Sequence, residues 1–246
     1  MTNDAAKAPC ALVQPHVRRI LVAFAALALL AVAGTLGPAR VSAHGSAAGS
    51  RTSFADIARR CAAKTDGSGF GSVTIQKTVV SKHETVRLGV PCTIHLTHGA
   101  TLDIEGSTLK TAKLIVADDD DAHVSSSVRI AGGTTMTGTA SAGLLIQLRH
   151  AGDTIFVDHA TITYPLSVFL ETLNSDGSGT PGNITVTSTT ITSSSSASEG
   201  IHLMAEGAGT FRRDTFRTPA DDGSAVMYAA TCTRSHVTGG VPKCSP

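Results

Sequence analysis

The sequence predicts an all-β solenoid, because it combines a repeated phrase, a strand-like composition and regularly placed turn residues. In each phrase one apolar residue is followed five or six positions later by a second one, with threonine directly before the second in all but the last copy. The second apolar positions are Leu109, Met136, Ile162, Ile191, Phe216 and Val237, in steps of 27, 26, 29, 25 and 21 residues. Units of this length bury apolar side chains only against neighbouring units, which is typical of solenoids.

Another apolar segment precedes each phrase, so each turn of the chain is expected to supply at least two short strands separated by corners. These segments are residues 92–96, 114–116, 144–148, 168–170, 201–203 and 226–228. Their β-branched content, with Thr, Ser and Gly at the corners, argues against helical solenoids. The Leu-x-x-Leu-x-Leu pattern of a leucine-rich horseshoe is absent. A parallel β-helix is the architecture that remains.

A short helix is predicted ahead of the strands, over residues 53–63. Ser53 and Asp56 form a capping box, and Phe54, Ile57 and Cys61 follow at helical spacing. Turn residues then end the helix before residue 72, where the β-helix is expected to begin. Such a helix would cap the open end of the solenoid, which otherwise exposes unpaired strand edges.

Residues 1–43 resemble a secretory signal peptide. Arg18 and Arg19 precede an apolar run over residues 20–36, and small residues end at Ala43. The run is short for a membrane span of about 20 residues, although a retained anchor is the alternative, and both general and twin-arginine export fit the pattern. The expected organisation is a signal over 1–43, a linker and capping helix over 44–71, and a β-helix with a C-terminal tail over 72–246.

The charge of the mature chain argues against nucleic acid as a partner. Cleavage after Ala43 reduces the 20 basic residues to 16 and the 19 acidic residues to 18, so the net charge is about −2. Four cysteines remain, none at the close spacing of a zinc site. Three pairings are open to them, and we favour Cys61–Cys92 and Cys232–Cys244, one link near each end of the solenoid.

The repeat length and strand content over residues 72–240 resemble the right-handed β-helix, or pectate-lyase-like, superfamily. The resemblance is one of architecture, and it implies a right-handed coil and a polysaccharide ligand. The Gly-His-Gly and Arg-x-Lys signatures of polygalacturonase-like relatives do not occur in the sequence, and the Gln-Asp phrase of pectin methylesterases was not found. A fold does not determine a function, so catalysis stays undecided.

Alignment of the phrases stacks candidate binding residues on successive coils. Arg213 and Arg234 share one column, with Arg212 and Asp214 beside them and His159 two coils earlier, about 10 Å away at the strand spacing. Guanidinium groups suit the carboxylates of an acidic polysaccharide. A solvated corner with weak surface ion pairs is the alternative.

Two further patterns carry weaker hypotheses. The acidic run 118–121 and the segment 174–179 offer oxygen ligands for calcium, although each is more typical of a solvated loop. Thr-x-Thr at 135–137, 161–163 and 190–192 resembles the flat threonine arrays of some antifreeze proteins, although threonine is also common in strands. No other metal site is expected.

The sequence therefore favours a secreted β-helix that contacts acidic polysaccharide or the cell surface without a strong catalytic site. The alternatives are a lyase or hydrolase that uses the arginine cluster, a structural or adhesive stalk, and an ice-binding surface. The chain has no Trp and only two Tyr, which disfavours the aromatic platforms that grip neutral sugars.

Overall fold

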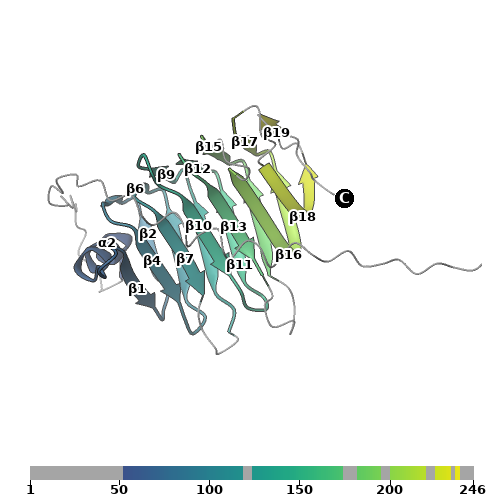
Figure 1. The fold of residues 1–246 in the computed structure, drawn as a ribbon. Coiled ribbons are helices and arrows are strands. Elements are labelled where there is room, and N and C mark those ends of the chain that lie inside the picture. The colour runs from purple at the N-terminus through teal and green to yellow at the C-terminus, as the bar shows by residue number, and fades with distance from the viewer. Residues whose placement is uncertain are drawn as a thin grey trace, which may run out of the picture. The chain divides into compact units, whose positions relative to one another are not determined.

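The described part of the chain forms a parallel β-helix of three sheets, preceded by one short helix (Figure 1). The structure is a computed structural model that describes residues 52–118, 124–173, 182–194, 200–219, 225–233 and 236–238, with the last two ranges described through their backbone alone. The expected signal segment, residues 1–43, lies outside these ranges. No helix of the described ranges is long and apolar enough to cross a membrane.

Each of the first five coils contributes one strand to each sheet. Sheet I contains β1 (Gly71–Ile75), β4 (Cys92–Leu96), β7 (Leu114–Asp118), β10 (Leu144–Leu148) and β13 (Val168–Thr172). Sheet II contains β2 (Val79–Lys82), β5 (Thr101–Glu105), β8 (Ser127–Ala131), β11 (Thr154–Asp158) and β14 (Asn183–Thr187). Sheet III contains β3 (Thr85–Leu88), β6 (Thr108–Thr111), β9 (Thr135–Gly138), β12 (Thr161–Tyr164), β15 (Thr190–Ser193), β17 (Thr215–Arg217) and β19 (His236–Thr238).

In the last two coils, sheets I and II merge. The long strands β16 (Ile201–Arg212) and β18 (Ala225–Thr233) pass from one sheet into the other, and their pairing shifts register between Met204 and Gly209. All the ladders between successive coils are parallel, as in the predicted architecture.

Each repeated phrase begins on a strand of sheet II and ends on a strand of sheet III, with the corner between them. Each coil therefore has three strands, where at least two were expected. In each of six coils this corner begins with a residue of positive φ, and in the third coil Gly133, with φ of 81°, is a second such residue. The first residues of the corners are His83, Gly106, Gly132, His159, Ser188 and Arg213, with φ of 52°, 58°, 66°, 48°, 51° and 60°. Glycine adopts this region readily, whereas the other four residues are unusual there.

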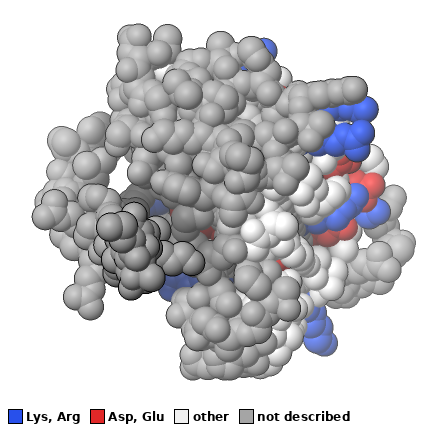
Figure 2. Space-filling model, turned by 90° about the vertical axis from the view of Figure 1, so that its right-hand side faces the viewer, with Lys and Arg blue, Asp and Glu red and all other residues white. Residues whose placement is uncertain are grey.

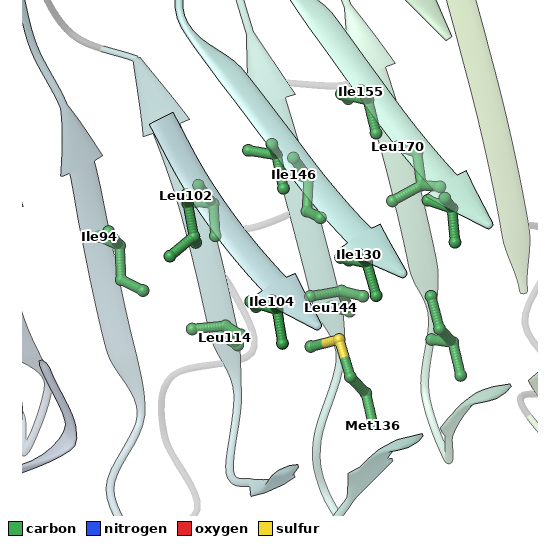
Figure 3. Packing of buried hydrophobic residues seen from close by; sticks show 14 of the residues in the cluster. Ile94, Leu102, Ile104, Leu114, Ile130, Met136, Leu144, Ile146, Ile155 and Leu170 are labelled. Atoms are coloured by element: carbon green, nitrogen blue, oxygen red, sulfur yellow. The ribbon is translucent and has the colours of Figure 1, made fainter. Parts of the chain in front are cut away.

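The predicted register is confirmed. Ile104 pairs with Ile130, Ile130 with Val157 and Val157 with Val186 along sheet II. On sheet III the second apolar positions form one continuous column from Leu109 through Met136, Ile162 and Ile191 to Phe216 and Val237. Alternate residues of the strands are buried, so the apolar columns of all three sheets meet in one core (Figure 3).

The helix α2 (Phe54–Ala63) caps the first coil as predicted. The Asp56 amide donates to Ser53 Oγ at 3.2 Å, and the Ser53 amide donates back to the Asp56 carboxylate at 3.1 Å. Its apolar face is buried against β1 and β3. Gly71 opens β1 directly beneath the helix, where a Cβ would overlap the carbonyl of Cys61.

A disulfide joins Cys61 in α2 to Cys92 in β4, which confirms the first predicted pairing. Both cysteines are fully buried, so the link fastens the cap to the second coil. Of the second predicted pair, Cys232 lies in β18 with its side chain outside the description, and Cys244 lies outside the described residues.

Candidate functional site

Sheet III presents two outward columns that run along the solenoid. The first column is threonine in six successive coils: Thr85, Thr108, Thr135, Thr161, Thr190 and Thr215. The second column is Arg87, Lys110, Thr137, Thr163, Thr192 and Arg217. We call these twelve residues the threonine face. All of them are exposed or half-buried, because the residues between them take the inward positions.

The predicted threonine array is therefore longer than the three Thr-x-Thr segments indicated. Its first column begins at Thr85, in a copy of the phrase that has Ser81 in place of the first apolar residue, which is why this copy was missed. Arg87 belongs to the same copy, and sequence reasoning did not single it out. Lys110 and Arg217 interrupt the threonines of the second column.

Sheet II has a different outer surface, on which cations and carboxylates are paired. Lys82 Nζ lies 2.7 Å from Glu105 Oε2, and Arg129 donates to Asp103 Oδ1 at 2.7 Å. Lys82, with a smaller effect from Arg129, holds the pKa of Glu105 below its ordinary value. Figure 2 shows Lys and Arg atoms interleaved with Asp and Glu atoms on one flank of the molecule. The charged side chains on the outer surface of sheet II therefore largely pair with one another.

Within the part of the chain that the structure describes, the cations of the threonine face lack such partners. Neither outward column contains a carboxylate, and among the described residues no ion pair involves Arg87, Lys110 or Arg217. Arg87 and Lys110 are direct register partners on β3 and β6. Neighbouring strands lie about 4.8 Å apart, and like charges opposite one another destabilise a sheet. The Arg87–Lys110 pair therefore creates a local site of positive potential.

The predicted arginine column lies at the left-handed corner, beside the last described coils of the threonine face. Arg213 and His159 share this corner with Ser188 between them, as the phrase alignment predicted. Arg212 and Arg213 are exposed, and Arg212 is the last residue of β16. Arg234 lies outside the described residues. The His159 ring lies 2.8 Å from the Asp158 carboxylate on the exposed side of the corner.

Asp214 was expected in the exposed arginine cluster, but its side chain is buried and only 1% exposed. Its carboxylate accepts the Thr189 amide of the preceding coil at 2.9 Å. Three other side chains accept the amide of the equivalent residue one coil earlier in the same way: Ser107 from Glu84, Thr134 from Ser107 and Thr189 from Ala160. Asp214 therefore continues a hydrogen-bond ladder inside the corner.

Aromatic side chains give no platform for a neutral sugar on this face. Tyr164 ends β12 but is fully buried, and its hydroxyl lies 2.7 Å from Thr111 Oγ1. Burial raises the pKa of this phenol. The side chain of Tyr228 lies outside the description, and Phe156, which is 36% exposed, lies on sheet II.

The two calcium candidates lie mostly beyond the described residues. Of the acidic run, Asp118 is described and is buried at the end of β7, whereas 119–121 are not described. The segment 174–179 is also outside the description.

Comparisons with known proteins found no match: no family model, curated protein or solved structure matches the chain. The threonine face and the exposed Arg212 and Arg213 beside it therefore carry the functional argument.

Proposed function

We propose that this protein is exported and binds an acidic polysaccharide, outside the cell or at its surface, through the threonine face. The observation that carries the proposal is the unpaired cation pair Arg87–Lys110 on a face without a described carboxylate. A polymer carboxylate placed between the two cations would relieve their repulsion, and a guanidinium binds carboxylate in a bidentate manner. The buried disulfide Cys61–Cys92 is compatible with export.

The length of the face suits an extended chain. Four strand spacings separate Lys110 on β6 from Arg217 on β17, so cations lie about 19 Å apart along the solenoid. Arg212 and Arg213 add two exposed cations at the corner of the same coil as Arg217. A polymer lying along the axis would therefore meet positive charge near both ends of its footprint.

The threonines between the cations supply hydroxyl groups at a regular spacing. A β-branched side chain has few rotamers, so binding to Thr137, Thr163 and Thr192 costs little side-chain entropy. Each hydroxyl both donates and accepts hydrogen bonds. This pattern fits the alternating hydroxyl and carboxylate groups of an acidic polysaccharide.

The test is calorimetric titration of the mature protein with polygalacturonate and alginate at low and high salt. The double variant Arg87→Ala, Lys110→Ala should weaken binding at least tenfold, and wild-type affinity should fall as salt rises through screening. Lys64→Ala, Lys77→Ala is the matched control, because it removes two exposed cations elsewhere and should leave affinity nearly unchanged. A second variant, Arg212→Ala with Arg213→Gly, tests the corner.

Two outcomes contradict the proposal. Wild-type protein that binds neither polymer at low salt has no acidic polysaccharide site of this kind. Equal losses in the Arg87–Lys110 variant and in the Lys64–Lys77 control show a general charge effect and no site on sheet III.

Ice binding is a second candidate, favoured by the first column of six threonines on one continuous ladder. The variant Thr163→Lys separates the two functions. It places a bulky charge in the middle of the array, so it should abolish thermal hysteresis if the ligand is ice. If the ligand is an acidic polymer, the same variant should strengthen binding.

A further inference from the structure

A carboxylate occupies a core position of sheet I. Asp118 is the last residue of β7 and pairs in register with Leu96. Its side chain is fully buried, as is that of Leu96. An isolated carboxylate in such a position is costly, so its partners determine what the site does.

Asp118 meets two residues of the next coil, at the corner between sheets I and II. The His150 Nδ1 atom lies 2.6 Å from Asp118 Oδ2. Asp153 is fully buried beside them, and its two carboxylate oxygens accept the amides of Ser126 at 2.7 Å and His150 at 2.6 Å. One potential ligand atom from each of Asp118, His150 and Asp153 lies within 4.8 Å of the others.

Two polar atoms at this corner have no hydrogen-bond partner in the described structure. Asp118 Oδ2 is buried and makes no hydrogen bond, although it points at the His150 ring. The hydroxyl of Ser126, whose amide binds Asp153, is also buried without a hydrogen bond. Buried polar atoms are satisfied in nearly all native structures, and exceptions indicate an ion, a water molecule or a functional group in reserve.

The charge of the corner points the same way. Two adjacent carboxylates, those of Asp118 and Asp153, are removed from water at this corner. A shared proton neutralises one negative charge of the pair, whereas a dication neutralises both. A metal ion would replace the 2.6 Å contact between Asp118 Oδ2 and His150 Nδ1, because each of these atoms would then bind the ion.

We propose that Asp118, His150 and Asp153 form a binding site for one divalent transition-metal ion that fastens two successive coils together. An imidazole nitrogen with two carboxylate oxygens suits zinc or manganese. Calcium prefers an all-oxygen shell of six to eight ligands, which this corner does not offer. Because Asp118 belongs to the third coil and the other two residues to the fourth, the ion would bridge the ends of β7 and β10.

The test is equilibrium dialysis of the chelator-treated mature protein against Zn²⁺, with metal counted by mass spectrometry. Wild type should bind one more zinc ion than Asp118→Asn or His150→Gln, and each substitution should weaken affinity at this site more than about 100-fold, because even outer-shell changes cost up to that factor. Excess Ca²⁺ should not displace the ion. His202→Gln is the matched control, since His202 lies 3.2 Å from the single carboxylate of Glu171, and it should keep full zinc content.

Three results overturn the proposal: no zinc retained by wild type, equal zinc in wild type and the folded Asp118 and His150 variants, or displacement by Ca²⁺. If the variants fail to fold, zinc-soaked wild-type crystals decide the question at the zinc absorption edge. An anomalous peak about 2.0–2.1 Å from His150 Nδ1 supports the site. Absence of that peak excludes the site.

Discussion

At the residue scale, the corner between sheets II and III depends on two kinds of position. One residue, or two in the third coil, takes a left-handed conformation, and the residue that follows has a buried polar side chain that accepts an amide from the preceding coil in several coils. At the first position Gly106 is constrained further, because a Cβ there would overlap the His83 ring. At the second position the acceptor varies between serine, threonine and aspartate, so the hydrogen bond matters more than the identity of the side chain.

The substitution Asp214→Ala should destabilise the protein by about 1–3 kcal/mol, because it leaves the buried Thr189 amide without an acceptor. Asp214→Thr should restore most of this loss, since Thr134 and Thr189 make the same bond in earlier coils. Urea denaturation of the three proteins measures the difference. If Asp214→Ala is as stable as wild type but loses polymer binding, the aspartate faces a ligand and the ladder is secondary.

The outer surface of sheet I carries an acid-sensitive contact at Glu171. Burial by itself raises the pKa of Glu171, but hydrogen bonds from His202 and Gln147 outweigh this effect and hold its pKa below the ordinary value. The folded state therefore binds fewer protons than the unfolded state near pH 4, and this contribution to stability is lost as the pH falls through the folded pKa. Melts from pH 6 to pH 3 should show a shallower decline for Glu171→Gln than for wild type; equal slopes would remove Glu171 as a cause.

At the scale of the strands, much of the fold could be predicted because like residues stack in register. The phrase predicted the column from Leu109 to Val237 without a structure. The third strand of each coil was not predicted, because only one or two left-handed residues turn the chain between sheets II and III, and in four of the six coils that residue is not glycine. The roles of Asp118 and Asp214 could not be predicted either, because each binds a residue of another coil. The Arg149 amide donates to Asp118 Oδ1 from 31 residues away, and the Thr189 amide donates to Asp214 from 25 residues away.

The register predicts different effects of substitution at two neighbouring residues of β15. Ile191 is fully buried between Ile162 and Phe216, so Ile191→Asp should cost on the order of 4 kcal/mol by placing an unpaired charge in the core. Thr192 is half-buried on the outer face, and Thr192→Asp should change stability by less than about 1 kcal/mol. Denaturant melts compare the two variants, and equal effects would show that the register of β15 is wrong.

At the scale of the whole molecule, each coil is stabilised mainly by its two neighbours, so the ends determine where unfolding starts. The N-terminal end is closed by α2 and fastened by Cys61–Cys92. The double variant Cys61→Ala, Cys92→Ala should lower stability by roughly 3–4 kcal/mol, from the loop-closure entropy of a 31-residue separation. Calorimetry under non-reducing conditions tests this loss, and an unchanged melting temperature would mean that α2 holds its place without the link.

The same disulfide has a mechanical consequence. When the molecule is stretched from its two termini, the chain between Cys61 and Cys92 cannot extend, although it contains the first coil and the end of the cap. A pulled molecule should therefore release about 100 Å less contour length than its reduced form, given 31 residues at about 3.3–3.6 Å each. An anchored protein under tension would keep its first coil closed by the disulfide while later coils unfold. When the tension is removed, refolding would start from that coil.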